Sequence, residues 1–454
     1  MDLFGTAGIR GDVRDRVTTD LALRVGRAVG AHAHEAGDRE FVVGRDGRTT
    51  GPGLAAAVES GLLATGADVR RVGRVPTPAL AYASRGRRGV MLTASHNPPT
   101  DNGIKLFVDG QEYGETAETA VESRVADDPG HADWTAWGQR TETEPLAAYR
   151  EAIRSYAERF GADPSETTVA VDCGNGVAAR ATPQVLRALG ANVVTLNANV
   201  DGHFPGRESK PTPETLRDLR AFVADGDAQL GIGHDGDADR IVIVDGDGEV
   251  VHEDTVLAIL AEAYVRAQEF ADPVVVTTPN ASGRIDERVA AAGGRVERVA
   301  LGYLHDGITA AREAGGDVAF AAEPWKHVHT ALGDWIDGVA SAAVFTRLVA
   351  ETGLDGLREP VTERPYRKES VDCPDDAKRA AMERLETALP AAFPETDAET
   401  EYGVRLTFPD ESWLLVRPSG TEPYVRVYAE SDEVDRVVAE AVETVRETVE
   451  TTTG

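Results

Sequence analysis

The sequence predicts an α/β fold with three similar α/β domains, whose sheets are mixed but largely parallel, followed by a C-terminal α+β domain. Three observations support this prediction. The chain has 454 residues, which is more than one hydrophobic core usually organises. A single order of strand, glycine-rich turn, helix and strand occurs three times, and a segment of different character follows it. We place the domains at residues 1–145, 146–250, 251–363 and 364–454.

The first copy of the repeat begins at Phe41. It consists of a strand, a glycine-rich turn, a helix over Leu54 to Thr65 and a second strand over Asp68 to Val72. The same order begins again at Thr168 and at Pro273. Strands that alternate with helices of this length predict βαβ units with right-handed crossovers, and therefore sheets that are largely parallel.

A further strand in each copy runs directly into a polar loop. The loops contain His96 in the first copy, Asp235 in the second and Glu323 in the third. In open α/β sheets, ligands bind outside the carboxyl ends of the strands. The three loops therefore lie where a site is expected, and together they can line one central cleft.

The last part of the chain has a different pattern. A long helix over Asp375 to Leu389 precedes strands at 403–408, 412–416 and 424–430. The final stretch carries small apolar residues at helical spacing, which predicts an amphipathic helix with this stripe in the core rather than on a partner: Val434, Val437, Val438, Ala441, Val442, Val445 and Val449. These elements predict the α+β domain.

Composition disfavours several classes of partner. A formal net charge of −30 without a basic run argues against nucleic acid. The chain has no run of about 18 apolar residues and no leader pattern at its start, so we expect a cytoplasmic protein with no membrane partner. Its two cysteines, Cys173 and Cys373, provide neither a disulfide framework nor zinc-ligand spacing.

The charged residues are also unevenly chosen. Asp and Glu total 77, whereas Lys occurs at only five positions. This resembles proteins of salt-loving cells, often archaeal, in which surface carboxylates keep the protein hydrated and salt screens their repulsion. GC-biased codon usage is the alternative for the preference of Arg over Lys, but it explains the acidity less well.

The first polar loop, Thr93 to Pro98, brings the hydroxyl of Ser95 and the imidazole of His96 to the end of an apolar strand. Such a hexapeptide can form an ordinary turn. The second loop carries Asp235, Asp237 and Asp239 at alternate positions, an oxygen-rich set suited to Mg²⁺, although Asp-Gly-Asp also occurs in hairpin turns. A serine beside a dication is suited to accept and donate a phosphoryl group.

Two further stretches are suited to bind phosphate. The N-terminal segment Gly5 to Gly11 combines free amides with Arg10, although a flexible turn is the alternative. In the fourth domain, Arg417 to Pro423 joins two strands, and Arg426 follows. Hydroxyls, a glycine amide and two arginines within ten residues predict an anion site.

In these loops the sequence resembles the α-D-phosphohexomutase superfamily, which includes phosphoglucomutase, phosphomannomutase and phosphoglucosamine mutase. The resemblance covers essentially the whole chain and is closest at Thr93 to Pro98, Asp235 to Arg240 and Arg417 to Pro423. It implies four domains around a central cleft and a phosphoryl group carried by Ser95. The enzyme would give that group to one end of a hexose phosphate and take the other back from a hexose 1,6-bisphosphate, which also serves as activator.

The resemblance also implies residue roles. One Mg²⁺ per chain is expected on the metal ligands Ser95, Asp235, Asp237 and Asp239. The reacting phosphate is expected beside Arg10, His96, Asn97 and Arg240. The phosphate that does not react is expected at Arg417, Ser419, Gly420, Thr421 and Arg426. Lys105 is the candidate general acid or base, and a solvated surface lysine is its alternative.

The third loop departs from the superfamily pattern. Glu323 and His327 occupy the positions expected to contact sugar hydroxyls, but Trp325 and Lys326 replace the usual Ser and Gly. Trp325 could stack on the sugar or pack between domains. Upstream, the loop before His305 also differs from the superfamily, so His305 is a further site candidate, with the nearby core as its alternative.

The predicted function is interconversion of hexose 1-phosphate and hexose 6-phosphate, with glucose, mannose or glucosamine as the sugar. Two alternatives remain open: a serine-based sugar-phosphate phosphatase and a non-catalytic sugar-phosphate binding protein. Neither requires two anion sites facing one sugar. The sequence does not distinguish a monomer from a homodimer.

Overall fold

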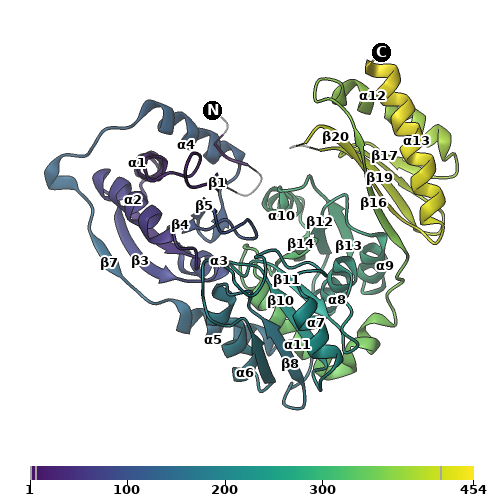
Figure 1. The fold of residues 1–454 in the computed structure, drawn as a ribbon, viewed down its shortest axis with the longest axis horizontal. Coiled ribbons are helices and arrows are strands. Elements are labelled where there is room, and N and C mark those ends of the chain that lie inside the picture. The colour runs from purple at the N-terminus through teal and green to yellow at the C-terminus, as the bar shows by residue number, and fades with distance from the viewer. Residues whose placement is uncertain (1–2, 6–7, 420–421, 454) are drawn as a thin grey trace.

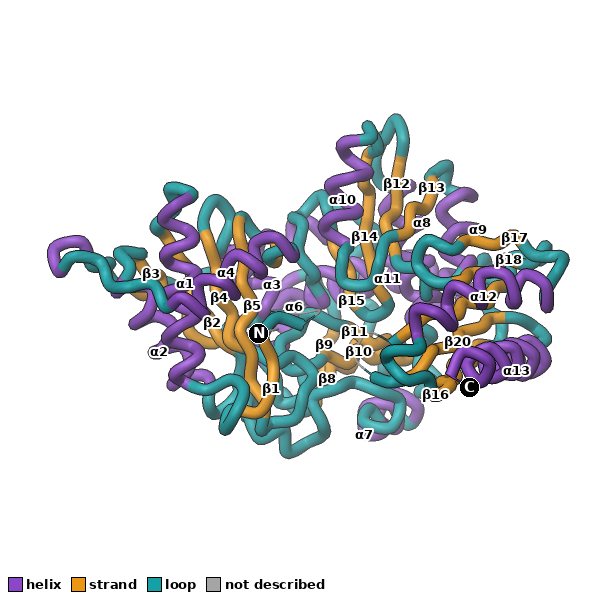
Figure 2. The backbone as a smooth tube through the Cα atoms, turned by 90° about the horizontal axis from the view of Figure 1, so that it is seen from above, coloured by secondary structure: helices purple, strands orange, loops and turns teal. Residues whose placement is uncertain are grey.

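The computed structural model describes residues 3–5, 8–419 and 422–453. Four units, each built on its own sheet, follow one another in an arc (Figure 1). Seen from above, the first unit lies at one end and the fourth at the other (Figure 2). Three units with mixed, mainly parallel sheets precede one with an antiparallel sheet, so the predicted fold class is confirmed.

The first unit is a sheet in the order β1-β5-β4-β2-β3-β7, with β6 paired to β5. Its strands are β1 (Ile9–Asp12), β2 (Glu40–Arg45), β3 (Asp68–Arg74), β4 (Arg88–Leu92), β5 (Asp101–Val108), β6 (Gln111–Glu112) and β7 (Arg140–Glu142). Its helices are α1 (Thr19–Glu35), α2 (Gly51–Ala64), α3 (Thr77–Ala83) and α4 (Glu115–Asp127), and a 3₁₀ turn spans Trp134–Ala136.

The second unit has the order β11-β10-β8-β9 and the third β13-β12-β14-β15. The second comprises α5 (Leu146–Ala157), β8 (Thr168–Asp172), the 3₁₀ turn Val177–Arg180, α6 (Thr182–Ala188), β9 (Asn192–Leu196), α7 (Arg217–Ala224), β10 (Leu230–His234) and β11 (Ile241–Val244). The third comprises α8 (Glu253–Arg266), β12 (Pro273–Thr277), α9 (Gly283–Ala291), β13 (Arg295–Arg298), α10 (Leu304–Glu313), β14 (Asp317–Glu323), β15 (Lys326–Val328) and α11 (Gly338–Arg358).

One strand order is common to these three sheets. The first strand of each repeat lies between the second and the third, in parallel with both: β2 between β3 and β4, β8 between β9 and β10, and β12 between β13 and β14. An antiparallel strand then returns beside the third: β5, β11 or β15. The three predicted polar loops are the connections into these return strands, so they occupy equivalent places.

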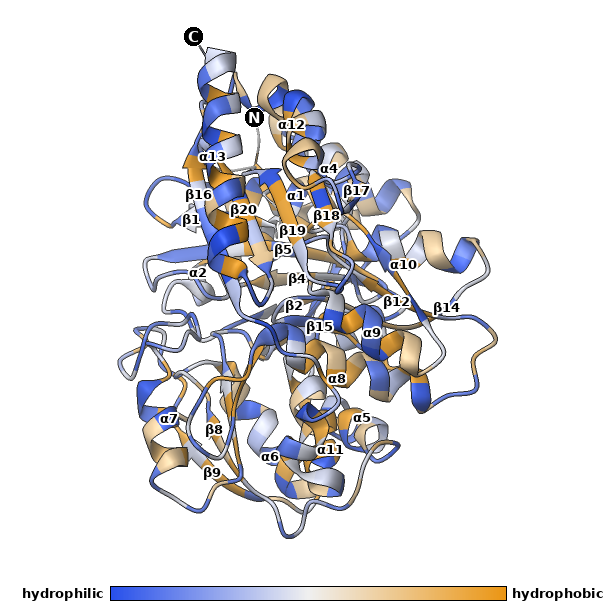
Figure 3. Ribbon diagram, turned by 90° about the vertical axis from the view of Figure 1, so that its right-hand side faces the viewer, coloured by the Kyte–Doolittle hydropathy of each residue, from blue (hydrophilic) through white to orange (hydrophobic). Residues whose placement is uncertain are grey.

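The fourth unit is an antiparallel sheet in the order β16-β20-β19-β18-β17. Its elements are β16 (Tyr366–Asp372), α12 (Lys378–Ala392), β17 (Asp397–Glu399), β18 (Val404–Thr407), β19 (Trp413–Pro418), β20 (Tyr424–Glu430) and α13 (Val434–Thr453). Both helices pack on one face of the sheet (Figure 3). The valine stripe of α13 is buried there with the inward residues of β18 to β20, as its spacing predicts.

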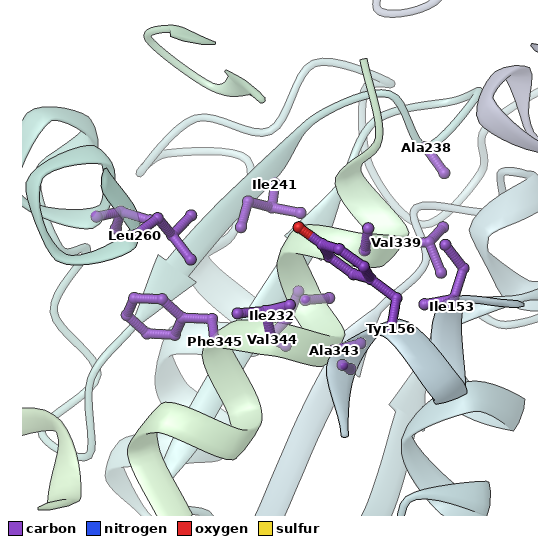
Figure 4. Packing of buried hydrophobic residues seen from close by; sticks show 14 of the residues in the cluster. Ile153, Tyr156, Ile232, Ala238, Ile241, Leu260, Val339, Ala343, Val344 and Phe345 are labelled. Atoms are coloured by element: carbon purple, nitrogen blue, oxygen red, sulfur yellow. The ribbon is translucent and has the colours of Figure 1, made fainter. Parts of the chain in front are cut away.

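The second and third units share one core. Helix α11, which follows the third sheet, packs against α5, α6 and α8 and against the strands of the second sheet. Figure 4 shows Val344 and Phe345 of α11 with Ile232 and Ile241 of the second sheet and Leu260 of α8. Burial of such side chains contributes roughly 1.5–3 kcal/mol each, so these units are held together by apolar packing. Within the described ranges, no helix is long and apolar enough to cross a membrane.

Candidate active site

Ser95 lies in the connection from β4 to β5, where the sequence places the reactive hydroxyl. The residue is fully buried, and its Oγ donates a hydrogen bond of 2.6 Å to Oδ2 of Asp235. Its φ of 51° is in the left-handed region, which non-glycine residues adopt at a cost. Its N–H donates to Oγ1 of Thr93 over 2.9 Å, and its carbonyl accepts from Oγ of Ser209 over 2.7 Å. The first unit's serine thus directly contacts the second unit's acidic loop.

The three aspartates of that loop converge as predicted. Asp235, Asp237 and Asp239 are buried, and one oxygen from each lies within 4.8 Å of the others. Thr77 at the start of α3 donates to Oδ2 of Asp237 over 2.6 Å. Among the described residues, Oδ1 of Asp237 and Oδ1 of Asp239 are buried without a hydrogen-bond partner. Unpaired buried carboxylate oxygens are costly, and an all-oxygen set of this kind suits Mg²⁺.

The electrostatics of the loop support a cation there. Burial and the charges of Asp239 and Asp237 raise the pKa of Asp235 well above its ordinary value. Burial also acts to raise the pKa of Asp239, but Lys105 and Arg240 outweigh it and hold that pKa below its usual range. Without a dication the cluster therefore favours a proton on Asp235, and a bound dication would favour the ionised form.

Lys105 is buried between two carboxylates. Its Nζ donates to Oδ2 of Asp239 over 3.0 Å and to Oε1 of Glu112 over 3.1 Å. Burial alone would lower the pKa of Lys105, but these carboxylates raise it above the ordinary value, so the ammonium is charged. The alternative of a solvated surface lysine is therefore wrong.

A neutral histidine and two arginines lie near the loop that carries Ser95, Thr93 to Pro98, which we call the serine loop. Nδ1 of His96 lies 3.3 Å from Oγ of Ser95, and burial together with Arg240 and Arg10 lowers the pKa of this imidazole to about 2, so it is neutral. Nε of Arg240 lies 3.9 Å from Oδ2 of Asp235. Within the described residues, Nε of Arg10 is buried without a hydrogen-bond partner. These side chains leave donors available to an anion at Ser95.

The third loop lies beside the second. Arg240 and Lys326 form a β-bridge that joins the acidic loop to β15. Oε1 of Glu323 accepts from the N–H of Gly302 over 2.6 Å, and its Oε2 lies 3.2 Å from Nζ of Lys326. A cavity of about 610 Å³ opens between the first and third units. Its polar lining includes Lys105, Glu112, Tyr303, His305, Glu323 and Lys326.

Two predicted sugar contacts are placed differently. His327 pairs with Ala322 in the β14–β15 ladder, one position from the pair of Glu323 and Lys326, so the pleat turns it to the opposite face. There its Nδ1 lies 2.9 Å from Oγ of Ser341 in the core. Trp325 has a φ of 70° and is partly buried against an apolar cluster of the second unit, which agrees with the alternative that it packs between units.

The fourth unit contains a pair of directly opposed arginines. Arg417 of β19 pairs with Arg426 of β20, and like charges placed opposite one another destabilise a sheet. Nη2 of Arg417 donates to the hydroxyl of Tyr428 over 3.0 Å, while Nε of each arginine is buried without a partner in the described part of the chain. Ser419 follows β19, and its carbonyl accepts from Lys378 over 2.7 Å. The predicted site residues Gly420 and Thr421 lie outside the described residues.

Several functional contacts are not evident from the sequence. Thr77, Glu112 and Ser209 touch the acidic loop, the buried lysine and the serine loop, respectively. Thr77 and Ser209 come from segments distant in sequence from the groups that they contact. Glu112 is seven positions from Lys105 and reaches it through the pairing of β5 with β6. Thr77 follows β3 closely and Glu112 ends β6, whereas Ser209 lies in the long connection from β9 to α7, so these three residues share no local signal.

Family models of phosphoglucomutase/phosphomannomutase match most of the chain. The models for alpha/beta/alpha domain I, alpha/beta/alpha domain II and the C-terminal domain match residues 1–130, 147–248 and 370–447. The chain belongs to this family. It is therefore an enzyme of the phosphohexomutase type, an isomerase that acts on a sugar phosphate.

Curated relatives and a solved structure agree with this assignment. The phosphopentomutase of Thermococcus kodakarensis is 41% identical over 441 residues, which cover 95% of this chain and 94% of that protein. A probable phosphoglucosamine mutase of Methanopyrus kandleri is 40% identical over 465 residues, covering 98% and 99%. A phosphoglucomutase/phosphomannomutase family protein of Burkholderia thailandensis has a TM-score of 0.85 at 26% identity, covering 99% and 97% of the two chains.

Proposed function

We propose that this enzyme is a Mg²⁺-dependent mutase that interconverts hexose 1-phosphate and hexose 6-phosphate through phosphorylated Ser95 and a hexose 1,6-bisphosphate. One observation carries the proposal: Oγ of Ser95 is hydrogen-bonded to Asp235 within a buried cluster of three aspartates. A hydroxyl in that position can receive and return a phosphoryl group whose charge the cluster's cation would neutralise.

Asp235, Asp237 and Asp239 would hold the Mg²⁺ together with the phosphoryl oxygens on Ser95. The ion would supply charge neutralisation for the transferring group. The chain's own residues position the reaction. Arg10 and Arg240 have donors available beside Ser95, and the neutral imidazole of His96 can donate to or accept from an oxygen on that serine.

Proton transfer is the proposed role of Lys105. When a sugar hydroxyl attacks, the bond from phosphorus to Oγ of Ser95 breaks, a bond to the sugar oxygen forms, and the hydroxyl proton must leave. Lys105 starts charged because Glu112 and Asp239 flank it. It is therefore suited first to give a proton to the departing serine oxygen, and then, once neutral, to take one back.

The second phosphate would be held in the fourth unit. Arg417 and Arg426 are opposed in the β19–β20 ladder, and Nη2 of Arg426 also lies 3.2 Å from Oε2 of Glu422. A phosphate between the two guanidinium groups would form charge-assisted hydrogen bonds with both. Glu323 and Lys326 line the cavity between the first and third units, where they can contact sugar hydroxyls. A fixed second phosphate allows the bisphosphate to present either end to Ser95.

A substrate panel tests the proposal. Glucose 1-phosphate, mannose 1-phosphate, glucosamine 6-phosphate and ribose 5-phosphate are incubated with the enzyme, Mg²⁺, the matching sugar bisphosphate and concentrated KCl. Ribose 5-phosphate is included because one curated relative is a phosphopentomutase. The expected result is isomerisation of a hexose phosphate and its loss in Ser95→Ala.

The same assay distinguishes the alternatives. Free phosphate that accumulates without any isomer would indicate a phosphatase. Turnover of ribose 5-phosphate alone would replace the hexose by a pentose. No turnover on any substrate, with folded protein phosphorylated at Ser95, would refute the proposed function.

A further inference from the structure

We propose that Arg48 is a positioning residue for phosphoryl transfer, which holds the serine loop in its reactive shape without touching the phosphate. The inference rests on the proposed function, because it concerns the same serine. Arg48 lies in the turn after β2 and is fully buried. It belongs to the first unit, but its surroundings join two units.

All donors of the guanidinium group are taken by three backbone carbonyls of the serine loop, one carbonyl at the start of β5 and one carboxylate. Its Nη2 donates to the carbonyls of Ser95 and Asn97 over 2.9 and 2.7 Å. Its Nη1 donates to those of Pro98 and Asp101 over 2.5 and 2.9 Å. Nε donates to Oδ2 of Asp46 over 3.0 Å. Four carbonyls thus converge on one cation.

The occupied donors exclude the obvious alternative role. A guanidinium group has five N–H donors, and the five hydrogen bonds of Arg48 use all of them. No donor is left for a phosphate or a sugar hydroxyl, in contrast to Arg10 and Arg240. Arg48 can therefore affect the reaction only through the loop that it holds.

Asp46 extends this support back to the loop. The Oδ2 atom that receives Nε of Arg48 also accepts from Oγ1 of Thr93 over 2.8 Å, and Oγ1 of Thr93 in turn accepts from the N–H of Ser95. The hydrogen bonds from Asp46 through Thr93 reach the N–H of Ser95, and Arg48 binds the carbonyl of Ser95 directly. Such support is needed because Ser95 has a φ of 51°, which the local sequence would not maintain alone.

The second unit covers this arrangement from outside. The guanidinium carbon of Arg48 lies 5.1 Å from the ring centre of Phe204, a cation–π contact. Ser209 donates to the carbonyl of Ser95. A Cβ on Gly202 would lie 2.6 Å from Cα of Arg48, so the two chains meet without room for a side chain. Segment 202–209 therefore shields Arg48 and its hydrogen bonds from water and fixes the serine loop relative to the acidic loop.

A second arginine allows a matched comparison. In the second unit, Nε of Arg207 donates to Oδ2 of Asp172 over 3.0 Å, and its Nη2 donates to the carbonyl of His234 over 2.5 Å. Asp172 ends β8 as Asp46 follows β2, so the first two repeats each anchor a polar loop from the end of their first strand. Arg207 holds the acidic loop, whereas Arg48 holds the serine loop. Substitutions of the two arginines should therefore have different effects on the reaction.

The test compares Arg48→Lys, Arg207→Lys and Arg45→Lys. Arg45 lies three positions before Arg48, and its guanidinium donates to the carbonyl of Asp46 but not to the serine loop. With Ser95 labelled by radioactive phosphate, transfer to the hexose phosphate and loss to water are measured separately in single turnovers. Melting temperature, KM and the Mg²⁺ concentration for half-maximal rate complete the comparison.

For Arg48→Lys we expect transfer to the sugar to fall about 100-fold, since a misplacement of about 1 Å can cost that much. KM and the Mg²⁺ requirement should change less than about twofold, and loss to water should fall less than transfer, because water can approach from more directions. Arg207→Lys should instead raise the Mg²⁺ requirement. Arg45→Lys should behave as the wild type.

Three results would overturn the proposal: a folded Arg48→Lys variant with transfer within about threefold of wild type, a rise in KM alone, or equal slowing of transfer and hydrolysis. If that variant does not fold, Ser209→Ala decides, because it removes one bond to the same carbonyl. It should slow transfer about tenfold, and unchanged transfer would overturn the proposal. A wild-type enzyme that gives no transfer to any sugar phosphate would instead refute the proposed function.

Discussion

In the substitution Gly236→Ala, the added methyl group on the acidic loop should push the serine loop away from it. A Cβ built on Gly236 would lie 2.8 Å from the carbonyl oxygen of Ser95 and 2.7 Å from Oγ of Ser209. Ordinary van der Waals contact begins at 3.4 Å, so the serine carbonyl must move by about 0.6 Å. The backbone of Gly236 is not in a region that alanine avoids.

The expected effect falls on kcat. A shift of this size in the hydroxyl should slow phosphoryl transfer roughly 10- to 100-fold, equivalent to about 1.4–2.7 kcal/mol on the barrier. Overpacking should also cost about 1–3 kcal/mol of stability. KM should change little, because the sugar is expected to bind to the third and fourth units.

Gly246→Ala is the matched control. Gly246 lies in the same unit, a Cβ there would meet nothing within 4 Å, and its backbone conformation is likewise open to alanine. Steady-state kinetics at saturating bisphosphate and a thermal melt are measured for both variants. A folded Gly236→Ala enzyme with kcat within about twofold of Gly246→Ala would refute the reasoning.

Three further predictions concern the metal, the second phosphate and pH. A chelator should lower the melting temperature and Mg²⁺ should restore it, because the buried aspartates repel one another without a cation. The Asp237→Asn variant should lose that response. A melting temperature that neither reagent changes would contradict the metal site. Arg417→Gln should raise KM for the sugar phosphate about tenfold or more with a smaller change in kcat, and should weaken stabilisation of the protein by inorganic phosphate; steady-state kinetics with an unchanged KM would argue against the anion site. Burial raises the pKa of Asp254 to about 7, so the folded protein retains a proton that the unfolded chain releases near its ordinary pKa of 3.8. The free energy of unfolding should therefore fall by about 1.4 kcal/mol per pH unit as the pH rises toward 7. Denaturant titrations of Asp254→Asn from pH 5 to 8 should lack this pH-dependent fall. A difference in unfolding free energy between variant and wild type that does not change with pH would contradict the prediction.

The repeated units could be predicted because their signal is local. Strand, turn and helix occur in the same order in each copy, and Ser95 and Asp235 follow the same strand of that order. The return strand β5 was not predicted, because Asn102, Gly103 and Lys105 interrupt its apolar pattern. All three are accommodated by contacts outside the strand. Nδ2 of Asn102 donates to Oγ1 of Thr50 over 2.9 Å, a Cβ on Gly103 would meet two backbone oxygens within 3 Å, and Lys105 is neutralised by Asp239.

The third loop shows where a sequence pattern stops being informative. Spacing alone places His327 near Glu323, but the two-residue connection between β14 and β15 pairs Glu323 with Lys326 and turns His327 inward. Trp325 is directed by its left-handed backbone toward the second unit, and no local rule fixes which unit lies there. Arg48 likewise occurs in an ordinary turn sequence, and only the fold brings four carbonyls to it.

The shared core of the second and third units has a consequence for how the chain matures. Helix α11 packs on α5, which begins nearly 200 positions earlier, and the hydrogen bond from Ser95 to Asp235 spans 140 positions. Contacts of such high sequence separation form late, since long loops must close first. A nascent chain that has been synthesised through the acidic loop still lacks α11, the helix that completes the core of the second unit. Recovery of activity during refolding should therefore lag behind recovery of helical signal, and activity reports the docking of the units rather than the folding of any one of them.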